Sequence, residues 1–181
     1  MRVISGIYRG RRLREPADNS VRPTTDKVKE SVFNIIQFDI EGRNVLDLFA
    51  GTGQLGIECL SRGARSVTFV DKSRESLSLV KENLRLCGAE GRVVCFDSLD
   101  YLKSCKTKYD LILLDPPYAT DLLNKSLEII NSVDILSESG IIICESMREK
   151  VLLEMKMPYY LRKEYFYGKI KLSVFSREAD V

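Results

Sequence analysis

The sequence of 181 residues contains no histidine and no tryptophan, and it lacks the run of about 20 consecutive apolar residues that a membrane span needs. The lack of histidine excludes Ser-His-Asp and Cys-His catalysis, and it removes the commonest zinc ligand. Charged Arg9 interrupts the first residues before a signal peptide can form. We therefore expect a cytoplasmic, monomeric protein with no membrane partner and no metal.

Cysteine is scarce and irregularly spaced. The five cysteines include no C-x-x-C pair, and Cys59, Cys95 and Cys144 lie within apolar stretches. This pattern is typical of a reduced protein whose thiols serve as small core side chains. Hydrophobic residues make up 44% of the chain and charged residues 30%, a balance that suits one globular domain and excludes a disordered chain.

Charge is unevenly distributed, although the net charge is only +2. Residues 1–14 contain five arginines and no acid, residues 31–146 carry 12 basic and 17 acidic side chains, and residues 147–172 carry 7 basic and 3 acidic ones. Both ends are therefore basic, and the middle is acidic. The asymmetry indicates a polyanion bound by the ends, with solvated surface arginines as the plainer alternative.

From residue 43 onward, short apolar runs alternate with helical patterns. They predict strands over residues 44–49, 66–70, 92–96, 109–114 and 140–144, and helices over residues 55–61, 73–86, 98–105, 121–131 and 148–155. Residues 159–167 and 169–176 alternate around Gly168, which predicts an antiparallel pair at the sheet edge. The expected fold class is α/β, with residues 41–181 forming a doubly wound, mostly parallel sheet that is covered by helices on both faces.

Residues 1–40 differ in character from this domain. Residues 3–7 and 11–13 flank a turn and predict a small hairpin, and Pro23 precedes a helix for which Thr25 is the expected N-cap. The apolar face of that helix consists of Val28, Val32, Ile35 and Ile36. We expect a basic arm and a docking helix in front of the sheet domain.

The first predicted strand runs into a glycine-rich loop before a helix. Gly51, Gly53 and Gly56 let a ligand approach the backbone, and free amides at the helix start can hold an anionic group. With Asp71 placed 20 residues after Gly51, the spacing also matches the dinucleotide fingerprint of NAD enzymes. Asp47, four residues before Gly51, instead favours a cofactor with a cationic amino-acid end.

Acidic residues end the first three predicted strands. Asp47, Asp71 and Asp97 stand at the edge of the sheet where ligands of open α/β folds bind. The three acids are therefore expected to converge on one ligand, although a simple helix cap is the alternative interpretation for Asp97.

The fourth predicted strand ends in Asp115-Pro116-Pro117-Tyr118. The two prolines remove two backbone donors and restrict the preceding residues, so the loop presents carbonyls beside a carboxylate and an aromatic ring. Asp115 and the carbonyl of Pro116 can accept the hydrogens of an amino group while Tyr118 stacks on the ring that bears it. The loop therefore predicts a site for an amino-bearing planar ligand, with a plain proline turn as the alternative.

Together these residues resemble the S-adenosylmethionine-dependent methyltransferases that act on exocyclic amino groups. Residues 2–11, 22–24, 47–58 and 167–168 narrow the resemblance to the bacterial 16S ribosomal RNA guanine(966)-N2 methyltransferase family, and it extends over nearly the whole chain. The resemblance implies a seven-strand Rossmann-like sheet, S-adenosylmethionine as cofactor, and 16S rRNA in small-subunit particles as substrate.

The resemblance also implies roles for single residues. The cofactor would be bound by Arg22, Thr24, Asp47, Gly51, Gly53, Asp71, Asp97 and Ser98, with Asp47 near its amino group, Asp71 on its ribose and Asp97 with Ser98 near its adenine. The catalytic target-base site would consist of Asp115, Pro116, Pro117 and Tyr118. RNA binding is expected from Arg9, Arg11, Arg12, Arg14, Tyr167 and Lys169.

Three other functions stay open at this point. A DNA adenine-N6 methyltransferase would use the same Asp-Pro-Pro-Tyr chemistry, but no extra target-recognition domain is visible in 181 residues. An NAD-binding oxidoreductase and a nucleotide-dependent RNA-binding module without catalysis are the others, and the Asp115–Tyr118 loop speaks against both.

Overall fold

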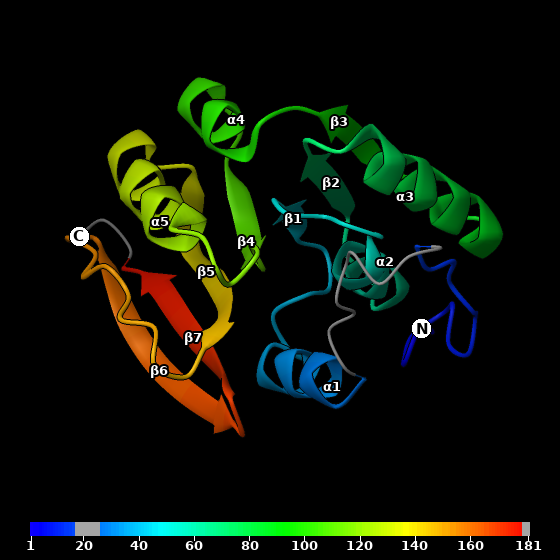
Figure 1. Ribbon diagram of the computed structural model, residues 1–181, viewed down its shortest axis with the longest axis horizontal. Coiled ribbons are helices and arrows are strands. Elements are labelled where there is room, and N and C mark those ends of the chain that lie inside the picture. The colour runs from blue at the N-terminus through cyan, green and yellow to red at the C-terminus, as the bar shows by residue number, and fades with distance from the viewer. Residues whose placement is uncertain (17–25, 179–181) are drawn as a thin grey trace.

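Residues 1–16 and 26–178, which the computed structural model describes, form five helices and one sheet of seven strands (Figure 1). In chain order the elements are α1 (Asp26–Ile35), β1 (Asn44–Asp47), α2 (Gln54–Ser61), β2 (Ser66–Asp71), α3 (Arg74–Cys87), β3 (Arg92–Cys95), α4 (Ser98–Ser104), β4 (Tyr109–Leu114), α5 (Leu122–Val133), β5 (Leu136–Met147), β6 (Tyr159–Tyr167) and β7 (Ile170–Arg177). None of the described helices is long and apolar enough to cross a membrane.

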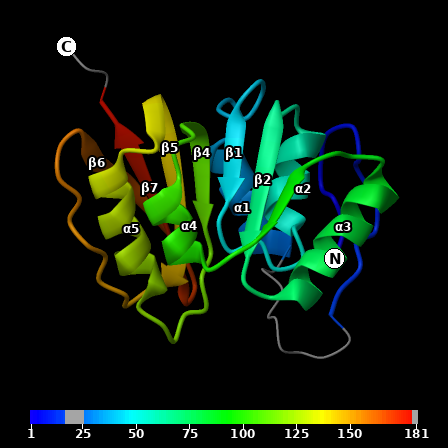
Figure 2. The same cartoon turned by 90° about the horizontal axis from the view of Figure 1, so that it is seen from above.

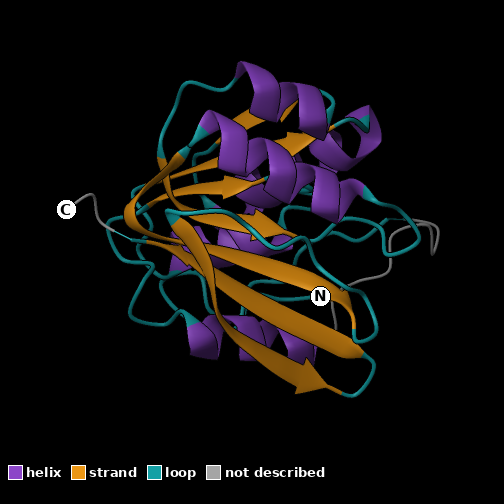
Figure 3. Cartoon of the chain, turned by 90° about the vertical axis from the view of Figure 1, so that its left-hand side faces the viewer, coloured by secondary structure: helices purple, strands orange, loops and turns teal. Residues whose placement is uncertain are grey.

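The strands follow the order β3-β2-β1-β4-β5-β7-β6, with the first five parallel and β7 antiparallel to both of its neighbours. The predicted α/β class is confirmed, and the sheet has the seven strands that the resemblance implied. Parallel strands between two helical layers bury both of their faces, which explains the apolar run over residues 111–114 of β4. Figure 3 shows the strands as one twisted layer with helices on both sides.

Two apolar cores lie on opposite faces of this sheet. One joins residues of the arm, α1, α2 and α3 to one face of the strands, and the other joins α4 and α5 to the opposite face. Figure 2 shows α4 and α5 in front of the strands and α1 behind them. Val3 and Phe33 lie in one core with Val45. The division of the chain into an arm with its helix (residues 1–40) and a sheet domain (residues 41–181) stays a prediction.

The amino-terminal arm is held on α2 by a buried carboxylate. Glu58 accepts backbone hydrogen bonds from Ile4 at 2.8 Å and from Ser5 at 2.9 Å. Its side chain is fully buried, as is that of Lys29 in α1, whose Nζ lies 3.7 Å from Oε2 of Glu58. Oε1 of Glu58 also accepts from Arg62 Nε at 3.0 Å, so the buried carboxylate lies between two cations and joins the arm, α1 and α2.

The arm itself is a short ladder without regular strands. Val3 N–H donates to Arg11 O and Gly10 N–H donates to Val3 O, each at 2.9 Å, and Arg2 and Arg12 form an isolated antiparallel bridge. The predicted hairpin pairing is therefore confirmed in these few contacts. The α1 helix is confirmed as well, whereas Pro23 and Thr25 lie outside the described residues.

The predicted helix over residues 148–155 is wrong, because this segment is irregular up to the start of β6. Side chains of α5 bind its backbone. Asn124 Nδ2 donates to Val151 O at 3.2 Å, Leu153 N–H donates to Asn124 Oδ1 at 2.9 Å, and Lys156 N–H donates to Asn131 Oδ1 at 2.6 Å. These bonds take the backbone groups that a helix would have paired internally.

The turn of the arm packs so closely on α2 that only glycine fits at residue 6. Gly6 has φ of +81°, Ile7 N–H donates to Ser61 O at 2.8 Å, and a Cβ on Gly6 would lie 1.8 Å from that same oxygen. Gly10 has the same φ, but a Cβ there would meet no atom within 4 Å. The two glycines therefore share a backbone requirement and differ only in the available space.

This difference gives a matched pair of variants. Gly10→Ala should lower the free energy of unfolding by ~1 to 2 kcal/mol, the cost of a left-handed backbone for a residue with a Cβ. Gly6→Ala should lower it by a further ~1 to 3 kcal/mol, because the α2 carboxyl end must also move. Urea unfolding of both variants measures the difference, and equal losses would show that the contact with Ser61 contributes nothing.

Candidate functional site

The carboxyl ends of β1, β2 and β4 bring three acids to one edge of the sheet. Asp47 ends β1 and pairs in register with Phe69 of β2 and Leu113 of β4. Asp71 and Asp115 follow those partners by two residues each, so they lie beyond Asp47 at the same edge. The chain order reverses between β1 and β4, and such a switch point is where open α/β sheets bind their ligands.

Asp71 holds the glycine-rich loop in place. Its Oδ2 accepts a hydrogen bond from Gly51 N–H at 2.9 Å, and its Oδ1 accepts one from Ser73 N–H at 2.8 Å, just before α3. Gly51 and Gly53 have φ of 52° and 79°, a backbone that side chains rarely allow. A carboxylate has about four lone-pair positions, so Asp71 keeps capacity to accept further hydrogen bonds from a ligand.

Asp47 lies at the bottom of this edge and is buried. Its Oδ2 accepts a hydrogen bond from Gly56 N–H at 3.0 Å. Burial raises the pKa of Asp47 from 3.8 to about 7; the Gly56 hydrogen bond opposes this shift, and the charges of Asp115 and Asp71 add to it. A carboxyl group with this pKa is poised to ionise when a cation arrives beside it.

Asp97 serves as the N-cap of α4. Its Oδ1 accepts hydrogen bonds from Leu99 N–H at 2.9 Å and from Asp100 N–H at 3.2 Å. The alternative interpretation of this residue as a helix cap is therefore confirmed. The side chain is exposed and Ser98 beside it is buried, and their predicted place near an adenine stays a prediction.

The Asp115-Pro116-Pro117-Tyr118 loop is tied to the neighbouring strand β5. The hydroxyl of Tyr118 donates a hydrogen bond to Oε1 of Glu145, which is only 5% exposed. Residues of the loop, of β5 and of the segments next to them line a small depression here: Pro116, Pro117, Tyr118, Thr120, Leu123, Glu145, Ser146, Met147 and Lys150. Three residues of the loop, Pro116, Pro117 and Tyr118, therefore line a small surface depression together with Glu145.

Glu145 is the residue of this site that the sequence analysis missed. The predicted strand ended at Cys144, one residue earlier, so the signal was the same acid at a strand end that marked Asp47, Asp71 and Asp97. In the structure β5 continues past this residue to Met147.

The residues predicted to bind RNA divide into two groups. The four predicted arginines are exposed, but Arg11 donates to Leu86 O at 2.9 Å and Arg14 Nε donates to Glu82 at 3.1 Å, both on α3. Arg9 belongs to the turn beside Ser61, at the end of α2 opposite the glycine loop. Tyr167 and Lys169 form the β6–β7 turn, at the same sheet edge as the acids. Arg22 and Thr24 lie outside the described residues.

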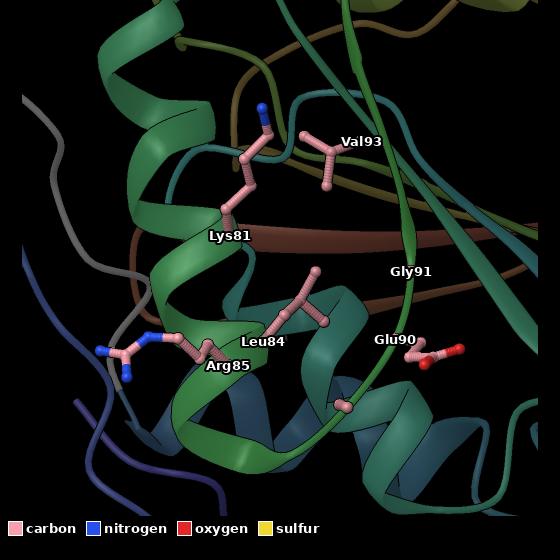
Figure 4. Close-up of a pocket in the computed structure, with 7 residues that line it drawn as sticks. Lys81, Leu84, Arg85, Glu90, Gly91 and Val93 are labelled. Atoms are coloured by element: carbon pink, nitrogen blue, oxygen red, sulfur yellow. The ribbon is translucent and has the colours of Figure 1, made fainter.

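A larger groove lies elsewhere. It measures about 560 Å³ and runs between α3 and the start of β3, with Lys81, Leu84 and Arg85 on the helix side and Glu90, Gly91 and Val93 on the strand side (Figure 4). The start of β3 belongs to the amino edge of the parallel sheet, opposite the strand-end acids. Cavity size therefore does not identify the site, and the positions of the acids do.

The raised pKa of Asp47 predicts a pH dependence of stability. Since the folded protein holds this proton up to about pH 7 and the unfolded chain releases it near pH 4, the contribution of Asp47 to the free energy of unfolding falls as pH rises between these values. Asp47→Asn should remove this loss. Relative to the parent, the variant should gain on the order of 3 kcal/mol between pH 5 and pH 8, at ~1.4 kcal/mol per pKa unit.

Urea unfolding without ligand at several pH values measures this gain. The amide oxygen of the substituted side chain can still accept from Gly56 N–H, so the loop contact is kept. Parallel pH profiles for parent and variant would contradict the assignment of the shift to Asp47.

Comparison with known proteins agrees with this geometry. The family model described as conserved hypothetical protein 95 matches residues 1–176. The chain is 38% identical to the Bacillus subtilis protein YlbH, over 98% of this chain and 99% of that one. It is 33% identical to the ribosomal RNA small subunit methyltransferase D of Escherichia coli, over 99% and 91% of the two chains.

Solved structures repeat the result. The Escherichia coli protein yhhF superposes with a TM-score of 0.91 at 31% identity, over 99% of both chains. A methylase from Haemophilus influenzae gives a TM-score of 0.82 at 30% identity, over 98% of both chains. The chain therefore belongs to the conserved hypothetical protein 95 family, and it shares sequence over nearly its full length with the ribosomal RNA small subunit methyltransferase D of Escherichia coli.

Proposed function

We propose that this protein transfers a methyl group from S-adenosylmethionine to the exocyclic N2 of a guanine in 16S ribosomal RNA. The observation that carries the proposal is the place of the Asp115-Pro116-Pro117-Tyr118 loop, which follows β4 directly beside β1 and its glycine loop. An amine acceptor site and a cofactor loop thus share one sheet edge. The substrate class rests on relatives that are named as small-subunit rRNA methyltransferases.

The residues around the β1 loop fit the cofactor. Gly51 and Gly53 leave the loop without side chains at two positions of positive φ, and Oε1 of buried Gln54 accepts no hydrogen bond from the described residues. Asp47 would bind the cationic amino group, and Asp71 would accept from the ribose hydroxyls. Asp97 and Ser98 would contact the adenine. S-adenosylmethionine supplies an electrophilic methyl group on a sulfonium sulfur, so the protein needs no histidine to activate it.

The Asp115–Tyr118 loop orients the amine. The guanine N2 lone pair is delocalised into the ring, so hydrogen bonds to Asp115 and the Pro116 carbonyl must hold the amino group and aim its lone pair. Such alignment of reactants can lower a barrier by ~7 to 11 kcal/mol. The base must leave its stack to reach the loop, at a cost of a few kcal/mol, and stacking on Tyr118 offsets part of it. The hydrogen bond to Glu145 keeps the Tyr118 ring in place.

Asp115→Asn tests the chemistry apart from binding. The amide keeps the size of the side chain but loses the charge that stabilises the developing positive charge on nitrogen, so turnover should fall ~10²- to 10³-fold. Affinity for S-adenosylhomocysteine should stay within about twofold, because the interactions assigned to Asp115 are made to the target base.

The measurement is single-turnover methyl transfer to small-subunit particles from cells that lack this gene, with N2-methylguanine identified by mass spectrometry. Asp121→Asn, on an exposed acid six residues along, is the matched control and should keep the parental rate. Parental turnover in Asp115→Asn, or methylation of adenine by the parent, would overturn the proposal.

Arg9 and Arg12 test the RNA contact of the arm, because neither makes a hydrogen bond to α3 among the described residues. Arginines that neutralise phosphates release counterions, so replacing both by Gln should flatten the plot of log affinity against log salt by ~0.7 to 0.9 per contact. Arg74→Gln, at an exposed residue at the start of α3, should leave the slope unchanged. Filter binding of 16S rRNA at several salt concentrations measures this slope. An unchanged slope in the double variant would show that both arginines are solvated surface residues that do not contact RNA.

A further inference from the structure

An arginine and a phenylalanine are stacked at the edge of the sheet that carries the proposed site. The guanidinium carbon of Arg148, the residue after β5, lies 5.0 Å from the ring centroid of Phe166 on β6. Arg148 N–H also donates to Lys169 O at 2.8 Å, which anchors the pair to the β6–β7 turn. In Figure 1, β6 runs down to this turn and β7 runs back up from it.

The pair is a short distance from the Asp115–Tyr118 loop. Ser146 on β5 lines the depression beside that loop. It pairs in register with Lys171 on β7, which in turn pairs with Phe166 on β6. Side chains of paired residues share a face, so these three form one row, and two strand spacings place Phe166 about 10 Å from Ser146.

The exposure of the pair distinguishes it from a packing contact. Phe166 is 50% exposed, and Arg148 is exposed as well. A second cation–ring pair on the same strand, Lys163 over Tyr165 at 5.0 Å, points to the opposite face, where Tyr165 packs against the core. Of these two pairs, the Arg148–Phe166 pair is therefore the one that presents a planar cation and a ring to solvent on the side of the depression.

We propose that Arg148 and Phe166 form a platform on which an unpaired RNA base next to the target nucleotide stacks. RNA-binding proteins bind splayed bases on aromatic rings and on guanidinium planes. Residues 147–172, which contain both side chains, carry a net charge of +4, and this charge complements a phosphate backbone. The inference rests on the proposed function, since it needs an RNA substrate whose target base has left its stack.

Two variants of the platform separate stacking from charge. Phe166→Ala removes the ring, and Arg148→Lys keeps the charge but loses the guanidinium plane. Each should weaken binding of 16S rRNA about 5- to 150-fold, while Arg148→Lys leaves the salt dependence of affinity unchanged. Binding is measured on the full-length protein with naked 16S rRNA and with small-subunit particles.

The same strand offers matched controls. Leu161 is 48% exposed and lies on the same face as Phe166, at the far end of β6, so Leu161→Ala removes similar apolar surface away from the site. Arg162→Lys makes the same arginine-to-lysine substitution as Arg148→Lys, but at the β6 bulge. Both controls should bind rRNA as the parent does, and affinity for S-adenosylhomocysteine should be the same in all four variants.

Three results would overturn the platform: parental affinity in Phe166→Ala and Arg148→Lys, equal losses in the two controls, or a loss seen with particles but not with naked rRNA. The last result would assign the pair to a ribosomal protein. Methyl transfer by the parent is recorded in parallel. If the parent methylates no guanine while both platform variants bind rRNA more weakly, the proposed function fails and the pair remains only an RNA-stacking site. If the parent methylates and the variants bind normally, only the platform fails.

Discussion

The parallel pairing of β1 with both β2 and β4 is the constraint on which the candidate site depends. Parallel strands end at one edge, so the acids that follow them must gather there whatever the intervening helices do. Gathering these acids makes ionisation of the buried Asp47 unfavourable: its pKa rises to about 7 through burial and through the neighbouring charges of Asp115 and Asp71. A cation beside this carboxyl group would favour its ionised form.

The glycine loop is held both by Asp71 at the end of β2 and by a side chain of α3. Asp71 binds its first amide, and Asn83 of α3, which is fully buried, donates to Thr52 O at 3.0 Å. The same Asn83 side chain accepts from Arg14 N–H at 2.6 Å. The arm that carries the arginines and the loop at the sheet edge therefore share one side chain. Together with Glu58, which accepts from Ile4 and Ser5, Asn83 holds the arm against α2 and α3.

Most of the fold could be predicted, because its signals are local. Apolar runs and helical periodicity indicated the order of strands and helices up to α5 and the antiparallel pair at the end. The predicted helix over residues 148–155 was wrong because the side chains that bind this segment are distant in sequence: Asn124 and Asn131 bind its backbone from α5. The full length of β5 was missed for a related reason, since its last residues pair with β7, which is distant in sequence.

The sequence by itself determined the chemistry of this protein: the absence of histidine, the acids at strand ends, the glycine loop and the Asp115-Pro116-Pro117-Tyr118 loop are properties of residue type and spacing. Tertiary structure alone decided how these groups are used. It buried Asp47, joined Tyr118 to Glu145 across 27 residues and brought Arg148 over Phe166. Such outcomes depend on which strands become neighbours and on how deeply each side chain is buried, and both are settled only when the whole sheet has formed.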